Sequence, residues 1–406
     1  MILHLSVLLL FIQATLVVSA PFDLIRKEYI DYNWLEVGFR RVEALSTSEW
    51  TSITTESVLQ NDNAVAFISI PDVAEIVKAD WYPDEHGVLF IPPIVPKMNG
   101  RPVHNEDGTF TFEFKLVFPN DSYCSKEWFV PTTPPTPVYL DVAWMLGPEG
   151  AYNLLMNHTD ENFNTNFIIG SGEITRASAE PIATNSNGNA IQLTYPTGCV
   201  TEEDYCTVHE LAGCIQQLQT SVNTVDNGRD LFLSVRAWQV KLRSVWFVLV
   251  PHDSRDASYF EITTPETVAY VVFPTESFAV CHDGLTFETR TFFNVTSYPI
   301  ALDYVFEYDY APGVFGMLGS VHSLVDSTTL SVYDRTTTNS IFITKEDQCT
   351  TEQTVHTTKE TVHVLIVGES ADSERLLQCN IKLTPGVPSS APTQESSLCI
   401  DIVTTH

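Results

Sequence analysis

Hydrophobic and polar residues alternate along much of this chain with the two-residue period of a β-strand. In Thr109–Val117, large apolar residues alternate with Thr, Glu and Lys, which predicts a strand with one buried face. Trp238–Arg243 alternates in the same way. It runs into the unbroken apolar stretch Val245–Val250, which is typical of a strand covered on both faces. Segments rich in Val, Ile, Phe, Tyr or Thr predict further strands at Ala64–Ile70, Val268–Phe273, Leu330–Tyr333, Ser340–Thr344 and Val362–Val367.

Helical periodicity is scarce and is strongest in residues 201–222. Thr201–Asp204 resembles a capping box, and apolar residues follow it at helical spacing. Such a helix would hold Cys206 and Cys214 about 12 Å apart, so each would need a different disulfide partner. Shorter helical candidates lie at Val73–Trp81 and Ser373–Cys379. Many short strands with one short helix near 201–222 predict a mainly β fold of two or more β-sandwich-like domains.

The N-terminal segment has the features of an export signal. Met1–Ala20 contains no Lys, Arg, Asp or Glu, is largely apolar and ends in small residues. This pattern predicts a signal peptide that is cleaved near Ala20 or Pro21, with an uncleaved anchor as the alternative. No later segment reaches the roughly 18 uninterrupted apolar residues of a membrane span. We therefore expect the mature protein to be secreted, with no membrane span after signal removal.

Proline content suggests where the chain divides. Val130–Pro137 is rich in Pro and Thr and favours an extended linker or crossing. The C-terminal end is rich in Pro, Ser and Thr, as mobile tails are. The predicted organisation is a signal peptide (1–20), an N-terminal β-rich domain (21–130), a linker or crossing (131–137), a C-terminal β-rich region of one or two subdomains (138–383) and a mobile tail (384–406).

Charge limits the class of partner. The chain of 406 residues has 21 Lys and Arg against 51 Asp and Glu, a formal net charge of −30. This argues against a nucleic-acid partner and against docking on anionic lipid, because both need basic residues. The expected partner is a protein or carbohydrate ligand outside the cell, and the oligomeric state is left open.

Cysteine usage agrees with export. An even number of cysteines in an exported chain predicts up to four disulfides, whose connectivity the sequence leaves open. No pair has the C-x2-C spacing of a zinc site. The disulfide candidates are Cys124, Cys199, Cys206, Cys214, Cys281, Cys349, Cys379 and Cys399.

Three Asn-x-Ser/Thr sequons are present. They begin at Asn120, Asn157 and Asn294 and are acceptors for N-linked glycans if the chain enters a eukaryotic secretory route.

The sequence contains one segment that resembles a catalytic motif, but its surroundings do not fit catalysis. Gly368–Asp372 follows an apolar strand and resembles a nucleophile elbow around Ser370. Its fifth residue is not glycine, and the only later histidine is His406, so an ordinary turn is favoured. His356 and His363 have no third ligand at a metal spacing, and no nucleotide-binding or HExxH motif occurs. We predict no catalytic, cofactor-binding or metal-binding residues, and no cofactor.

Two groups of residues allow a surface or a structural interpretation. Arg236, Lys241 and Arg243 form either an ordinary solvent face of a strand or a patch for an acidic partner. Aromatic residues alternate along Tyr304–Tyr310 and form either a contact surface or a buried face.

No family resemblance is recognised in these motifs. The favoured function is a secreted, acidic, disulfide-bonded glycoprotein that acts as a binding or structural module through surface contacts. One alternative is a secreted hydrolase whose site is assembled from distant residues. The other is a surface protein that is retained by a membrane partner.

Overall fold

The computed structural model describes the chain in segments. These are residues 26–29, 36–43, 50–55, 62–71, 95–117, 139–157, 162–174, 189–192, 211–219, 225–226, 229–230, 233–241, 244–251, 265–274, 278–282, 285–296, 299–319, 328–346, 358–369, 371 and 380–386. Every regular element in these segments is a β-strand, which confirms the mainly β prediction. Within them, no helix is long and apolar enough to cross a membrane.

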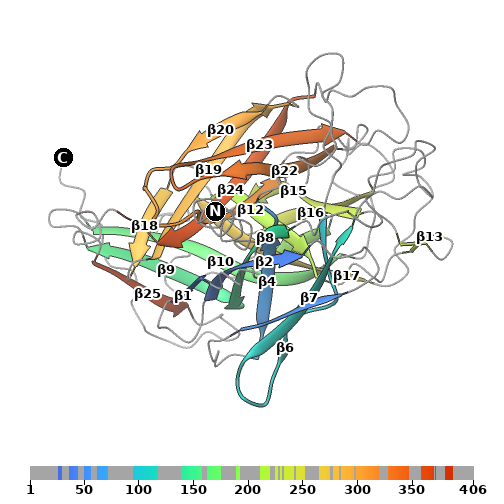
Figure 1. The fold of residues 1–406 in the computed structure, drawn as a ribbon, viewed down its shortest axis with the longest axis horizontal. Coiled ribbons are helices and arrows are strands. Elements are labelled where there is room, and N and C mark those ends of the chain that lie inside the picture. Colours follow the sequence, from blue (N-terminus) through green and yellow to red (C-terminus); the bar gives the residue numbers. More distant parts are fainter. Residues whose placement is uncertain are drawn as a thin grey trace, which may run out of the picture.

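Three antiparallel sheets surround the main core (Figure 1). The β8 sheet has the strand order β1 (Arg26–Tyr29), β2 (Glu36–Glu43), β8 (Tyr139–Pro148), β4 (Ala64–Ser69). The β17 sheet has the order β12 (Leu211–Leu218), β17 (Glu266–Pro274), β10 (Asn162–Ile174), β9 (Gly150–Asn157), β25 (Asn380–Gly386). The β24 sheet has the order β18 (Phe278–His282), β19 (Leu285–Val295), β24 (Glu360–Glu369), β21 (Gly313–Leu318).

Further antiparallel sheets complete the described part of the chain. The β7 sheet contains β3 (Thr51–Thr54), β7 (Phe110–Val117) and β5 (Val95–Met98), and β6 (Val103–His104) also pairs with β7. The β16 sheet has the order β11 (Asn189–Gln192), β16 (Ser244–Pro251), β15 (Leu233–Lys241). The β23 sheet has the order β20 (Ile300–Asp303), β23 (Asn339–Glu346), β22 (Thr328–Arg335). A two-stranded ribbon joins β13 (Val225–Asp226) and β14 (Arg229–Asp230).

The strands predicted from alternation are confirmed. In β7, Phe110, Phe112 and Phe114 are buried while the intervening residues are partly exposed. The predicted pattern over Trp238–Val250 forms two strands, because β15 ends at Lys241 and β16 begins at Ser244. The other predicted segments form β4, β17, β22, β23 and β24.

The helix predicted over 201–222 is wrong for its second half, which forms β12. This strand pairs with β17, with Cys214 opposite Val272. Both faces of β12 are buried, so its polar Gln216 and Gln217 lie inside and the two-residue alternation is lost. Residues 201–210 and the shorter helical candidates lie outside the described segments. The argument that helical spacing separates Cys206 from Cys214 therefore no longer applies.

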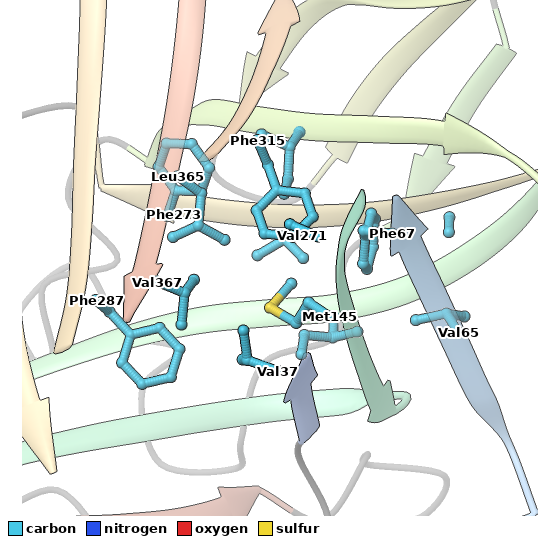
Figure 2. Close-up of a cluster of buried hydrophobic side chains, with 14 residues drawn as sticks. Val37, Val65, Phe67, Met145, Val271, Phe273, Phe287, Phe315, Leu365 and Val367 are labelled. Atoms are coloured by element: carbon cyan, nitrogen blue, oxygen red, sulfur yellow. The ribbon is translucent and has the colours of Figure 1, made fainter. Parts of the chain in front are cut away.

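The main hydrophobic cluster lies where the β8, β17 and β24 sheets meet. Figure 2 shows Val37 and Met145 of the β8 sheet converging with Phe273 of β17 and with Leu365 and Val367 of β24. A second cluster lies between the β24 and β23 sheets. It includes Val364 and Ile366, so alternate residues of β24 contribute to the two clusters. The β24 sheet is thus covered on both faces.

Strands from both sides of the proline-rich stretch share one sheet. β8, which follows residues 131–137, pairs with both β2 and β4. β25 extends to Gly386 and pairs with β9, so the first residues of the predicted tail belong to a strand. The proline-rich stretch itself lies outside the described residues. The domain boundaries stay predictions, as do the sandwich arrangement and the disulfides.

Candidate binding surface

The basic residue Arg236 is structural. Its side chain is fully buried, and its Nη2 donates a hydrogen bond to the Thr328 carbonyl at 2.7 Å. This bond ties β15 to β22. Both surface interpretations of the basic group are therefore wrong for Arg236. Lys241 ends β15, and Arg243 lies outside the described residues.

Glutamine side chains of the β12 segment replace a missing strand along β4, which is an edge of its sheet. Gln219 donates from Nε2 to the Ala66 carbonyl at 2.9 Å and accepts from the Ala66 N–H at 3.4 Å. Gln217 Oε1 accepts from the Ile68 N–H at 2.6 Å. An unpaired strand edge normally invites association with another strand. Here primary amides satisfy this edge internally.

On the opposite face of β12, the Gln216 side chain also hydrogen-bonds to the backbone of edge strands. Its Nε2 donates to the Leu318 carbonyl at 2.9 Å and to the Val235 carbonyl at 3.2 Å. These carbonyls belong to β21 and β15, each of which is the outer strand of its sheet. β12 therefore joins the edges of several sheets. Sequence reasoning missed this role, because a helical interpretation leaves the glutamines without assigned partners.

A buried carboxylate organises the segment after β20. Glu288 of β19 is fully buried, and its two oxygens accept from the backbone N–H groups of Val305 at 2.7 Å and Phe306 at 2.9 Å. Its Oε1 also accepts from the Tyr308 hydroxyl at 2.9 Å. Burial, followed by the negative charge of Glu288, raises the pKa of Tyr308 well above its usual range. Because this cluster is enclosed, it fixes the chain rather than offering a site to a substrate.

The aromatic row Tyr304–Tyr310 does not form one exposed face. Regular strand structure ends at Asp303, while Phe306 and Tyr308 are buried in the second cluster and Tyr310 is exposed. The buried interpretation therefore applies to Phe306 and Tyr308.

His363 of β24 is buried beside the main cluster. Its ring meets Phe273 edge-on, with 6.5 Å between ring centroids, and its Nδ1 lies 3.2 Å from the Thr291 hydroxyl. Burial lowers the pKa of His363 to about 4, so the ring is neutral at pH 7. Among the described residues, no group of three or more His, Cys, Asp or Glu could hold a metal ion. His356 lies outside those residues.

The turn after β24 is fastened to the segment that Glu288 holds. The Asp309 N–H donates to the Glu369 carbonyl at 3.0 Å, and the Ala371 N–H donates to the Glu307 carbonyl at 2.7 Å. Ser370 lies outside the described residues. The neighbouring backbone therefore serves as a connection between chain segments.

The β6–β7 hairpin carries exposed side chains on a hydrogen-bonded turn. Figure 1 shows it extending away from the other sheets. At its turn the Asn105 N–H donates to the Thr109 carbonyl at 2.8 Å, and the Gly108 N–H donates to the Asn105 carbonyl at 3.0 Å. Gly108 takes a positive φ of 86°, which favours glycine. Asp107 Oδ1 accepts from the Thr109 N–H at 3.0 Å and from its hydroxyl at 2.6 Å. The hydroxyl bond is the main cause that lowers the pKa of Asp107.

The base of this hairpin is fixed from two directions. The His104 ring stacks on Phe110 with 4.7 Å between centroids, and its Nδ1 lies 2.8 Å from a carboxylate oxygen of Asp62. Val103 next to it remains 64% exposed, and Glu106 at the turn is also exposed. The hairpin thus combines an ordered backbone with an apolar side chain and carboxylates that face solvent. The composition of Asn105–Gly108 predicts a turn before the Thr109–Val117 strand, but the sequence does not show that these side chains are exposed together.

Only some of the predicted disulfide and glycosylation residues lie within the described part of the chain. Cys214 is a free thiol and is fully buried, and Cys281 lies in β18; the remaining six cysteines are outside the described residues. Asn157 ends β9, and Asn294 is exposed near the end of β19. Asn120 is outside the described residues.

Comparison with known proteins identifies no relative of this chain. No family model, no curated protein and no solved structure matches it.

Proposed function

We propose that this protein is a secreted, acidic, disulfide-bonded glycoprotein that binds an extracellular partner through the β6–β7 hairpin. The observation that carries the proposal is the ordered hairpin with its exposed Val103. A surface that is already ordered loses little conformational entropy on binding, so more of its contact energy appears as affinity. The β24 and β23 sheets, which enclose the second cluster, are proposed to form a β-sandwich.

The charge of the hairpin indicates the kind of partner. Glu106 and Asp107 lie at its turn, and the whole chain carries a net charge of −30. A basic protein surface with an apolar centre complements this arrangement, and complementary charge speeds association. The enclosed Arg236, Glu288 and His363 favour a binding role over hydrolysis, because each is used inside the fold.

The first experiment tests export. The full chain, including residues 1–20, is expressed in a eukaryotic secretory cell, and the protein in the medium is sequenced from its N-terminus. We expect a start near Ala20 or Pro21. Protein that keeps Met1 and stays in the membrane fraction would contradict secretion.

The second experiment tests the hairpin. The purified protein is screened against an array of extracellular proteins and glycans, and the affinity of each hit is measured for Val103→Ser and Val305→Ser. Both valines are exposed, but only Val103 lies on the hairpin. We expect Val103→Ser to weaken binding about tenfold, a loss of about 1.4 kcal/mol, and Val305→Ser to leave it unchanged. Equal affinities of the two variants would refute the hairpin as the contact surface.

A further inference from the structure

We propose that Asn294 carries an N-linked glycan whose first sugar packs against the ring of Phe293. The inference rests on the proposed function in one respect, since a glycan requires passage through the secretory route. The proposed site is separate from the hairpin. It lies near the end of β19, where the glycan on Asn294 would cover the exposed ring of Phe293.

The backbone at this point is irregular in a way that presents two side chains together. In the pairing of β19 with β24, Phe292 lies opposite Val362 and Val295 lies opposite Glu360. Phe293 and Asn294 therefore share the position opposite Thr361, which makes a β-bulge. Asn294 takes a φ of 62°, in the left-handed region that asparagine tolerates better than most residues.

The bulge separates exposed from buried residues within the sequon. Val295 is buried in the second hydrophobic cluster, whereas Asn294 is exposed and Thr296 is partly exposed. A bulky glycan needs an acceptor on the surface. Asn294 is exposed in the structure and meets this requirement.

Phe293 gives the sugar an apolar platform. It is 69% exposed and is the most exposed of the large hydrophobic residues in the described segments. A pyranose ring has an apolar face of C–H groups, which can cover an aromatic ring and remove its surface from water. Since the bulge sets Phe293 and Asn294 side by side, a sugar attached to Asn294 would lie within reach of this ring.

The experiment measures occupancy first. The full chain is secreted from eukaryotic cells and treated with peptide N-glycosidase in ¹⁸O water, which marks each formerly glycosylated asparagine. We expect Asn294 to be marked in the wild type and in Thr296→Ser, which keeps the sequon, and unmarked in Thr296→Ala. Secreted protein with an unmodified Asn294 would overturn the inference and leave the proposed function intact. A chain that never enters the secretory route would instead overturn the proposed function.

The second readout tests the packing on Phe293. Thermal unfolding is compared for protein whose glycan at Asn294 is trimmed to one N-acetylglucosamine and for Thr296→Ala, which lacks that sugar. Each of the two is measured with Phe293 and with Phe293→Ser. We expect the single sugar to raise Tm by about 1–3 °C when Phe293 is present and to have no effect when it is replaced. Equal shifts in both backgrounds would overturn the packing. So would a dimer, seen with the sugar in place, that Phe293→Ser dissociates, because a second copy would then cover the ring.

Discussion

The buried His363 should make the stability of this protein sensitive to mild acid. Its ring lies against Phe273 and so close to the Gly319 backbone that a Cβ on Gly319 would come within 1.9 Å of Nε2. The neutral ring has the Thr291 hydroxyl as a hydrogen-bond partner. Protonation would place a positive charge in this apolar setting, and this cost lowers the pKa of His363 to about 4.

The sign and size of the effect follow from the two pKa values. An unfolded histidine has a pKa of about 6.5, so the unfolded chain takes up the proton first as the pH falls. The stability due to neutral His363 is complete above about pH 7 and is lost as the pH falls from 6.5 toward 4. The loss is about 2 kcal/mol at pH 5 and approaches about 3 kcal/mol below pH 4.

Urea unfolding followed by tryptophan fluorescence tests this at pH 7.5, 6.5, 5.5 and 5.0. Between the highest and lowest pH, His363→Gln should lose about 2 kcal/mol less free energy of unfolding than the wild type. The many acidic groups titrate in both proteins, so the difference isolates His363. As a control, Thr291→Val should lower stability by about 1 kcal/mol at every pH but keep the wild-type slope. Parallel profiles for wild type and His363→Gln would refute the reasoning.

Three further predictions follow from enclosed polar groups. Glu288→Gln should lower the free energy of unfolding by about 2–3 kcal/mol, because the amide that replaces the carboxylate places an N–H group against a backbone N–H donor. Unchanged urea unfolding would show that the Glu288 carboxylate does not hold the segment at Val305 and Phe306. Gln219→Leu should cost about 2 kcal/mol, since the Ala66 N–H and carbonyl both lose a partner; calorimetry measures this, and full stability would contradict the edge role. Burial raises the pKa of Cys214 well above its usual range, so its thiol should react with a disulfide reagent only after unfolding; labelling in native buffer, located by peptide mapping, would contradict its burial.

Local sequence determined most of the strands. β7 follows from alternation over Thr109–Val117, and β24 follows from the apolar stretch Val362–Val367. In β7, apolar residues two positions apart share one face, whereas the nearly unbroken apolar run of β24 is typical of a strand covered on both faces. Both patterns can be read without knowing the neighbouring strands. The turn before β7 follows likewise from Asn105–Gly108, since glycine at a positive φ closes it.

Only the tertiary structure decided which polar residues are buried and which strand edges they serve. β12 became a strand because its backbone pairs with β17 and its glutamines reach the edges of other sheets. Arg236 and Glu288 read as ordinary polar residues of strands, yet each is enclosed by carbonyls or N–H groups from distant segments. A buried polar group is stable only when its partner is in place. Because those partners lie far away in the sequence, no local pattern can reveal them.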